Sequence, residues 1–193
     1  MVVQQYWDAG HSWQGTSHCG YGSTVASLSV VLISFNEATR IDACLKRVAW
    51  ADEIIVVDSC STDDTVAIAS SHTSHVHTVP WRGFGPQKNY AIDLATGDWI
   101  LSIDCDEYVS EPLAAEIQQV IGGATCNGFT ISFRNRFLGR TMRFGQWAGE
   151  TKLRLFRRGT GRFTDVPLHE RLEVDGEINP LRGWIEHATG PTR

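Results

Sequence analysis

The sequence predicts a single α/β domain built on a mostly parallel sheet flanked by helices. From residue 28 to about residue 133, short apolar runs of strand length alternate with segments of helical periodicity. This order is typical of right-handed βαβ units. The chain has 193 residues, of which 42% are hydrophobic and 20% charged, as expected for one globular domain.

Each predicted strand is a short apolar run, and a helical pattern follows most of them. The first strand, Leu28–Ile33, is rich in β-branched residues, as buried parallel strands are. Asn36 can cap the next helix, in which Ile41, Leu45 and Val48 recur at helical spacing. Further strands are predicted at 53–57, 76–79, 99–103, 128–133 and 152–157, and further helices up to about residue 70, at 87–95 and at 111–121, with a loop at 83–86.

The two ends of the chain do not follow this pattern. Residues 1–27 contain one charged residue, Asp8, and no period of 2 or 3.6, so a poorly ordered N-terminal extension is expected there. The domain is expected over residues 28–193. Its strand and helix pattern breaks into shorter pieces after Arg134.

Several classes of protein are excluded by composition and motif. The five cysteines are scattered without a CxxC pair, which argues for reduced thiols in a cytosolic compartment and against a zinc knuckle. There is no apolar run of about 18 residues and no secretory signal. Neither GxGxxG nor GxxxxGK[ST] occurs, so a dinucleotide fold and a P-loop are not indicated.

The charge distribution points to an anionic partner bound at one place. The net charge is −5, yet nine of the 17 basic residues lie between Arg134 and Arg162, with Glu150 as the only acid among them. A local basic patch on an acidic protein favours an anionic ligand, although a solvated surface gives the same pattern.

Acidic and polar residues follow three of the predicted strands: Asn36 and Glu37, Asp58, and the pair Asp104 and Asp106. Ligands of open α/β sheets bind beyond the carboxyl ends of the strands. The two aspartates of the DxD pair share a face if the segment is extended, and they repel each other unless a cation lies near. Mg²⁺ or Mn²⁺ together with substrate phosphates fits such a pair; a capping pair before the next helix, and a simple cap at Asp58, are the structural alternatives.

These motifs resemble those of family 2 glycosyltransferases, which have the GT-A (Rossmann-like) fold. The resemblance covers about residues 28–187. It is carried by the segments 34–37, 56–65, 85–91 and 104–107, and then by 134–140, 145–147, 152–158 and 168–174. The later segments resemble bacterial lipopolysaccharide-core β-glucosyltransferases. The resemblance implies a nucleotide-binding half at 28–121 and an acceptor half at 122–193.

The resemblance also implies a donor site for a UDP-sugar. Glu37 and Asp58 would hold base and ribose, and Lys88 would lie near the nucleotide. Asp104 would touch ribose or metal, and Asp106 would ligate the Mg²⁺ or Mn²⁺ that bridges the diphosphate. The implied reaction is inverting: an acceptor hydroxyl attacks the anomeric carbon of the sugar, expected to be glucose, while UDP leaves.

Four residues of the later half are candidates for catalysis or acceptor binding. Glu170 is the candidate general base, with His169 as its rival or as a structural histidine. Trp147 could stack on a sugar face or pack structurally. Arg154 suits phosphates on the acceptor because its planar fork matches them.

Histidines give one further candidate and one cluster without a predicted role. His187 is a candidate third ligand for the metal or the diphosphate. His72, His75 and His77 form an HxxHxH pattern at a helix-to-strand junction. That junction lies away from the strand ends, so a surface role is predicted for them.

The expected partners are a nucleotide-sugar and an anionic glycan or glycolipid, without nucleic acid. The expected location is the cytoplasm, with peripheral contact to the inner membrane face. Relatives usually continue with helices where this chain ends, so a C-terminally truncated domain is expected. A degenerate transferase that only binds nucleotide or glycan remains an alternative. A nucleotidylyltransferase is disfavoured, because the loop at 34–37 is acidic and lacks glycine.

Overall fold

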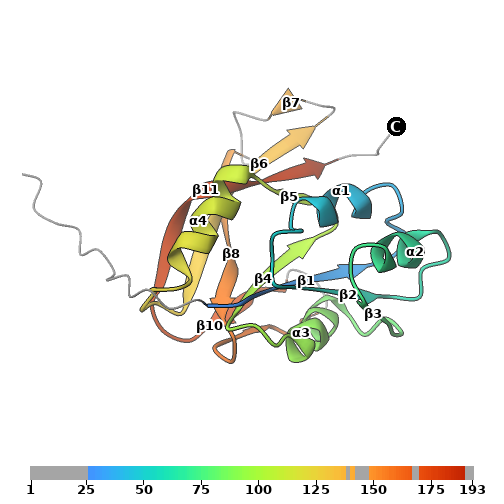
Figure 1. Ribbon diagram of the computed structural model, residues 1–193, viewed down its shortest axis with the longest axis horizontal. Helices are drawn as coiled ribbons and strands as arrows, with labels where there is room; N and C mark the ends of the chain where they lie inside the picture. Colours follow the sequence, from blue (N-terminus) through green and yellow to red (C-terminus); the bar gives the residue numbers. More distant parts are fainter. Residues whose placement is uncertain (1–25, 138–139, 142–147, 167–169, 190–193) are drawn as a thin grey trace, which may run out of the picture.

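The computed structural model describes residues 26–137, 140–141, 148–166 and 170–189. It confirms an α/β fold with one large sheet and helices on both of its faces (Figure 1). The order of the main sheet is β3-β2-β1-β4-β8-β6-β11-β5, with the short β7 beside β6. Its strands are β1 (Leu28–Ser34), β2 (Glu53–Asp58), β3 (His75–Thr78), β4 (Trp99–Asp104), β5 (Glu107–Val109), β6 (Gly128–Phe137), β7 (Arg140–Thr141), β8 (Ala148–Arg157) and β11 (Ile178–Thr189).

Two small strands and four helices complete the described fold. Strands β9 (Gly161–Phe163) and β10 (Leu172–Val174) form a separate antiparallel pair. The helices are α1 (Ile41–Lys46), α2 (Thr65–Ser70), α3 (Phe84–Leu94) and α4 (Glu111–Val120). None of the helices in the described ranges is long and apolar enough to span a membrane.

The alternating side chains of β1 explain why both faces of the sheet are covered. Val30 and Leu32 point into a core shared with α1 and α4, whereas Val31 points into a second core shared with α3. All three residues are almost fully buried. A strand covered on both faces shows a continuous apolar run instead of alternation, which is why the first strand was readable from sequence.

The first four strands place their carboxyl ends at one edge, as predicted. Strands β3, β2, β1 and β4 are mutually parallel. In their register Ser34 lies opposite Asp58, and Ile33 lies opposite Asp104. The ends of β1, β2 and β4 therefore meet within one residue of each other, and the polar residues that follow them share one edge.

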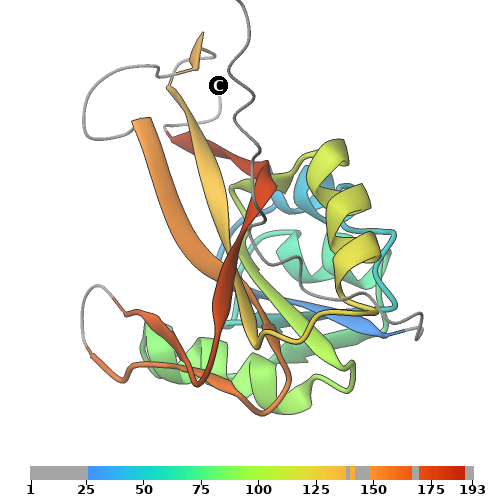
Figure 2. The same cartoon turned by 90° about the vertical axis from the view of Figure 1, so that its left-hand side faces the viewer.

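Beyond β4 the sheet is mixed and curled. Strand β8 lies antiparallel between β4 and β6, and β11 runs parallel to β6 (Figure 2). Strand β5 follows β4 by only two residues, yet it pairs with β11 at the far end of the order. The long β11 thereby returns to the end of β4, and His187 lies opposite Glu107 in the ladder.

The structure corrects or extends the predicted local structure at three places. The loop predicted at 83–86 is already helical from Phe84, because Gly83 takes the positive φ of 102° that turns the chain and Pro86 is tolerated in a first helical turn. The strand predicted at 128–133 extends to Phe137 and does not lie beside the first four strands. Strands β5 and β11 were not predicted, since neither shows a continuous apolar run.

Candidate active site

A cavity of about 520 Å³ opens at the carboxyl edge of the parallel strands. We call it the strand-end cavity. The segments that follow β1, β2 and β4 form its wall together with the segment before α3. The lining residues are Ile33, Ser34, Phe35, Glu37, Ser59, Trp81, Phe84, Asp104, Cys105 and Asp106.

A second cavity of about 690 Å³ lies on the other side of Asp104. We call it the β8 cavity, because Glu150, Lys152 and Arg154 of β8 contribute to its wall. Lys88 and Glu170 line it as well, and Phe84 and Asp104 are shared with the strand-end cavity. The two cavities thus meet at Asp104.

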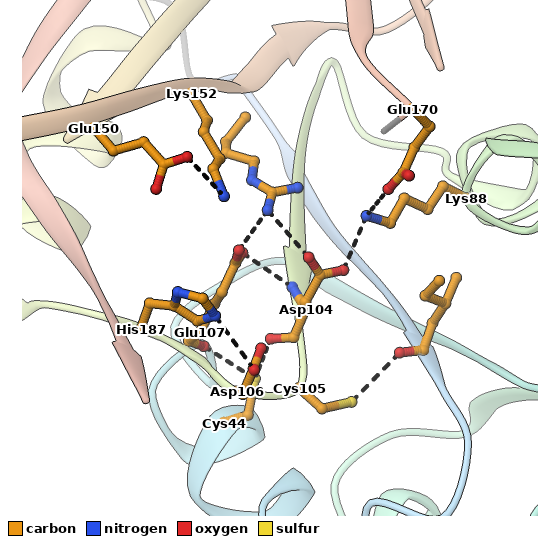
Figure 3. A network of polar contacts seen from close by, with 12 residues as sticks. Cys44, Lys88, Asp104, Cys105, Asp106, Glu107, Glu150, Lys152, Glu170 and His187 are labelled. Atoms are coloured by element: carbon orange, nitrogen blue, oxygen red, sulfur yellow. Dashed lines mark hydrogen bonds and ion pairs between the residues drawn. The ribbon is translucent and has the colours of Figure 1, made fainter. Parts of the chain in front are cut away.

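Asp104 is held by two cations, one on each carboxylate oxygen (Figure 3). The Lys88 ammonium lies 3.0 Å from Oδ1, and Nη2 of Arg154 lies 3.1 Å from Oδ2. Burial alone would raise the pKa of this carboxyl, but Arg154 and Lys88 outweigh it and hold the pKa of Asp104 well below its ordinary range. Asp104 is therefore an ionised carboxylate whose oxygens already accept from protein cations.

Arg154 points inward, which bears on the prediction that it binds phosphates of an acceptor. Only 5% of the residue is exposed, and the same Nη2 also donates to the carboxylate of Glu107. Its Nε is buried without a hydrogen-bond partner among the described residues. The guanidinium thus holds two carboxylates in place, and only the part that lines the β8 cavity remains for a ligand.

Glu107 completes this group of charges. It is 1% exposed, and its second oxygen accepts from the backbone N–H of Asp104 at 3.1 Å. Burial raises the pKa of Glu107, and the neighbouring Asp104 charge adds to that effect against the opposing charge of Arg154. Sequence reasoning gave no role to Glu107.

Lys88 joins Asp104 to the predicted base. Its ammonium lies 2.9 Å from Oε1 of Glu170, and the lysine side chain is only 6% exposed. The ammonium also lies over the ring of Phe163, 5.1 Å from the centroid. Glu170 thereby lines the β8 cavity, and it lies on the other side of Asp104 from Asp106 and His187 (Figure 3).

Asp106 faces His187 on the strand-end side. Nε2 of His187 lies 3.3 Å from Oδ2 of Asp106, and Nδ1 lies 2.7 Å from Oδ1 of the buried Asn135. The contact with Asp106 raises the pKa of His187, against the effect of its burial. Asn135 accepts from the Nδ1–H group and so directs Nε2 at the carboxylate, which is how histidine ligands of metals are commonly oriented.

The donor set of Asp106 and His187 fits a divalent ion only in part. The ranges that the structure describes contain no group of three or more His, Cys, Asp or Glu side chains that could hold a metal. A carboxylate and an imidazole, completed by oxygens from a substrate diphosphate, form a site of the kind that Mg²⁺ and Mn²⁺ use. Asp104 is engaged with Lys88 and Arg154, so Asp106 is the better placed of the two predicted ligands.

The turn that carries Asp104 and Asp106 is supported by two buried thiols. The Cys44 thiol of α1 donates to the carbonyl of Glu107 at 3.4 Å, and the Cys105 thiol donates to the carbonyl of Ile33 at 3.4 Å. Burial raises the pKa of both thiols. They therefore remain protonated and act as hydrogen-bond donors.

Asp58 lies beneath the site. It is fully buried, and its oxygens accept from the hydroxyl of Ser34 at 2.9 Å and from the N–H of Ser61 at 2.7 Å. The Ser61 hydroxyl donates to it as well. Its observed contacts join the end of β1 to the loop after β2, while the neighbouring Ser59 lines the cavity.

Glu37 does line the strand-end cavity, as the predicted donor site requires. Its carboxylate lies 3.3 Å from Nη1 of Arg40, and its backbone N–H donates to the Thr65 hydroxyl at 2.8 Å. Burial raises the pKa of Glu37, and Arg40 opposes that shift. Glu37 thus keeps one exposed side toward the cavity.

Two of the predicted site residues, His169 and Trp147, lie outside the described residues. His72 contacts Asp42 on the surface, with Nε2 2.9 Å from Oδ1, and His75 lies on the edge strand β3. The structure therefore brings together Glu37, Lys88, Asp104, Asp106, Arg154, Glu170 and His187 around the two cavities.

The inward orientation of Arg154 carried no readable signal in the sequence. The register of β8 against β6 shifts at this position, since Phe129 lies opposite Leu155 and Thr130 lies opposite Leu153. Strand alternation therefore does not fix the direction of the Arg154 side chain. Asn135 and Glu107 carried no signal either.

The fold and this site define a GT-A glycosyltransferase domain: a sheet with parallel strands whose carboxyl edge carries a DxD pair beside a cavity. The family model for glycosyl transferase family 2 matches residues 29–170. The chain therefore belongs to that family.

Relatives and solved structures agree with this assignment. An uncharacterized glycosyltransferase of Rickettsia conorii is 43% identical over 51% of this chain and 35% of its own length. The lipopolysaccharide core biosynthesis glycosyltransferase LpsC of Rhizobium meliloti is 28% identical over 80% of this chain and 60% of its own length. The structure of S. aureus TarS in complex with UDP-GlcNAc matches 86% of this chain and 60% of that chain, with a TM-score of 0.64 and 18% identity. The chain thus spans about a third of the rickettsial relative and 60% of LpsC.

Proposed function

We propose that this domain transfers a hexose, in the first instance glucose, from a UDP-sugar to a hydroxyl of a lipopolysaccharide-core or related glycan, with inversion at the anomeric carbon. One observation carries the proposal. The predicted diphosphate side, at Asp106 and His187, and the predicted base, Glu170, lie on opposite sides of Asp104, where two cavities meet.

The donor would occupy the strand-end cavity. Its diphosphate would lie at Asp106 and His187, with Glu37 on the nucleoside side. A divalent ion held by Asp106 and His187 would supply Lewis-acid stabilisation of the leaving diphosphate. In support, TarS has been solved in complex with UDP-GlcNAc, and both proteins share the fold.

The acceptor would occupy the β8 cavity, with its hydroxyl beside Glu170. As the hydroxyl oxygen forms its bond to the anomeric carbon, the Glu170 carboxylate takes the hydroxyl proton, and the bond from that carbon to the diphosphate oxygen breaks. Lys88 keeps the Glu170 carboxylate in place through its 2.9 Å contact. A base fixed within hydrogen-bond reach is what general-base catalysis requires.

The class of acceptor is supported by the relative LpsC, whose name places it in lipopolysaccharide core biosynthesis. Exposed Arg171 and half-exposed Lys152 at the β8 cavity suit an anionic glycan. Glucose as the sugar, a glycolipid acceptor, and peripheral contact with the cytoplasmic face of the inner membrane stay predictions.

The test separates donor binding from chemistry. We expect Glu170→Gln to lower UDP release from UDP-glucose, in the presence of Mn²⁺ and a lipopolysaccharide-core acceptor, by about 10²–10⁴-fold while leaving UDP affinity unchanged. Asp106→Asn should abolish the part of the UDP affinity that depends on Mn²⁺. The matched controls are Glu173→Gln and Asp93→Asn, both exposed and outside the two cavities.

Either variant can overturn its assignment. Full turnover in Glu170→Gln would remove Glu170 as the base. Unchanged Mn²⁺-dependent affinity in Asp106→Asn would remove the proposed metal site. Binding of UDP by the parent domain without any turnover would make it a binding module.

A further inference from the structure

The candidate base, Glu170, lies on a part of the chain that does not belong to the main sheet. Strands β9 and β10 form a two-stranded sheet of their own, and Glu170 comes two residues before β10. This β9–β10 pair lies against helix α3 (Figure 2). Asp104, in contrast, ends β4 of the main sheet. The position of the Glu170 carboxylate relative to Asp104 therefore depends on how the β9–β10 pair is attached to the rest of the domain.

Asn89 attaches β9 to α3 through both groups of its side-chain amide. Its Nδ2 donates to the carbonyl of Phe163 at 2.8 Å, and the N–H of Phe163 donates to its Oδ1 at 2.9 Å. Two residues that face each other in an antiparallel sheet exchange N–H and carbonyl bonds in the same way. The amide of Asn89 thus takes the place that a neighbouring strand would have beside β9.

One face of α3 receives the chain around β9. Gly85, Asn89 and Asp93 are spaced four residues apart, so they lie on the same face of the helix. At Gly85 a Cβ would lie 2.1 Å from the carbonyl oxygen of Thr164, a distance that no side chain tolerates without a shift of the backbone. Asp93 forms an ion pair with Arg162. The three helix positions therefore meet three consecutive residues of the β9 segment.

The attachment continues from β9 to the Glu170 carboxylate. The N–H of Thr164 donates to the carbonyl of Arg171 at 2.9 Å, and the N–H of Arg171 donates to the Thr164 hydroxyl at 3.0 Å. Glu170 directly precedes Arg171, and its carboxylate lies 2.9 Å from the Lys88 ammonium (Figure 3). Adjacent residues of α3 thus hold the backbone of this segment, through Asn89, and the carboxylate, through Lys88.

Apolar packing and the Asn89 amide contribute differently to this attachment. The Phe163 side chain is 6% exposed and packs in the core that β1, β2 and β4 share with α3. Hydrophobic contact is non-directional, whereas a hydrogen bond prefers a narrow range of distance and angle. The Phe163 side chain therefore keeps the β9–β10 pair on the domain, and the amide fixes where the pair lies along the helix.

We propose that Asn89 is a positioning residue for the transfer reaction: its amide fixes the β9–β10 pair along α3 and thereby places the Glu170 carboxylate beside the acceptor hydroxyl. This inference rests on the proposed function, because it takes Glu170 to be the general base. Asn89 is not among the residues that line either cavity, so it acts through Glu170. A base must lie within hydrogen-bond reach of the proton it takes, and a displacement of about 1 Å can lower a rate about 10²-fold.

The test measures turnover and donor binding in the same variants. We expect Asn89→Ala to lower kcat for UDP release from UDP-glucose, with Mn²⁺ and a lipopolysaccharide-core acceptor present, by about 10-fold to 100-fold. Its KM for UDP-glucose and its Kd for UDP should be unchanged, because the donor occupies the strand-end cavity. Gly85→Ala leaves the amide in place but pushes against the Thr164 carbonyl. It should show the same lower kcat with unchanged UDP affinity.

Asn127→Ala is the matched control. The Asn127 side chain also bonds to a backbone carbonyl, that of Asp175 at 2.7 Å, but this contact lies beyond the opposite end of β10 from Glu170. We expect Asn127→Ala to keep the kcat of the parent chain. Urea unfolding of all three variants shows whether each is folded under the assay conditions, and Gly85→Ala decides the outcome if Asn89→Ala is not.

A double variant shows whether Asn89 acts through the base. If Asn89 only positions Glu170, then Asn89→Ala combined with Glu170→Gln should turn over as slowly as Glu170→Gln alone, because effects of residues that act as a unit do not multiply. A double variant slower than Glu170→Gln by the full factor of Asn89→Ala would overturn the inference.

The outcomes also separate this inference from the proposed function. If Glu170→Gln loses turnover while folded Asn89→Ala and Gly85→Ala keep the parent kcat, the positioning role is wrong and the base stands. If Glu170→Gln keeps full turnover, both fail. If Asn89→Ala weakens UDP binding as much as it lowers kcat, the amide supports the domain in general, and the positioning role is again wrong.

Discussion

The two cavities that meet at Asp104 differ in how their charged groups are satisfied. On the β8 side, Lys88 and Arg154 lie between the carboxylates of Asp104, Glu107 and Glu170, each within salt-bridge distance. On the strand-end side, Asp106 has only the His187 contact among the ion pairs of the described residues. The two aspartates of the DxD pair therefore differ: Asp104 belongs to an internal ion network, whereas Asp106 keeps a single ion-pair contact among the described residues.

Removing Arg154 should produce the largest effect on stability. Arg154→Met leaves Asp104 and Glu107 beside each other without the guanidinium, and breaking a buried ion pair from one side costs about 3–5 kcal/mol. We expect the free energy of unfolding in urea to fall by about that amount. Adding Glu107→Gln should recover part of the loss, since it removes the carboxylate that is left without a cation, whereas Asp104 keeps its contact with Lys88.

Arg162→Met is the matched control for Arg154, because Arg162 pairs with Asp93 where both side chains are 55% exposed. An exposed pair contributes about 0–1 kcal/mol. Equal losses of unfolding free energy in Arg154→Met and Arg162→Met would show that the ion pairs of Arg154 contribute no more to stability than an exposed ion pair does.

On the strand-end side, the contribution of buried polar contacts to the free energy of unfolding can be tested at Asp58. Asp58→Ala removes the acceptor of the Ser34 hydroxyl, which is buried, and of the Ser61 N–H, which is partly buried. Unsatisfied buried donors cost about 1–3 kcal/mol, and we expect that loss in urea unfolding. UDP affinity measured well below the unfolding transition should change little. A large loss of affinity with unchanged stability would instead support the direct base or ribose contact predicted from sequence.

Asn135 offers a smaller and more selective change. Asn135→Ala removes the partner of His187 Nδ1 without touching Asp106 or the ring. Outer partners of ligating histidines contribute about 10-fold to 100-fold in metal affinity, so Mn²⁺-dependent UDP binding should weaken by that factor. Phe133 packs edge to face on the same ring, and a Phe133→Leu variant with the same loss would point to ring packing instead of the hydrogen bond.

The difference between the two cavities also explains which site residues could be predicted from the sequence. The strands at 28–34, 53–58 and 99–104 are buried on both faces, so their apolar runs are continuous and their ends were visible. Glu37, Asp104 and Asp106 follow from those ends because parallel strands align them at one edge. The positions of these three residues depend only on neighbouring parallel strands and on the short segments that follow them.

The contacts of Glu170 and His187 could not be derived in that way. The Lys88–Glu170 contact joins residues 82 apart, and the His187–Asn135 contact joins residues 52 apart. The first depends on the packing of β9 against α3, and the second depends on the pairing of β11 with β6. A single sequence carries no local signal for either. Glu170 and His187 entered the predicted site through residue type and family resemblance.

The smallest expected effect concerns His72, whose HxxHxH pattern could be mistaken for a metal site. Its Nε2 contacts Asp42, whose other oxygen contacts Lys46 at 2.7 Å, on the surface between α1 and the end of α2. Surface substitutions away from special features stay within about 0.5 kcal/mol, so His72→Gln should unfold in urea like the parent chain. Its Mn²⁺-dependent UDP affinity should also be unchanged, because the metal ligands proposed at the strand-end cavity are Asp106 and His187. If His72→Gln lowered the Mn²⁺ affinity and His187→Gln did not, the metal would bind near His72, away from the strand-end cavity. The proposed metal site beside Asp104 would then be wrong.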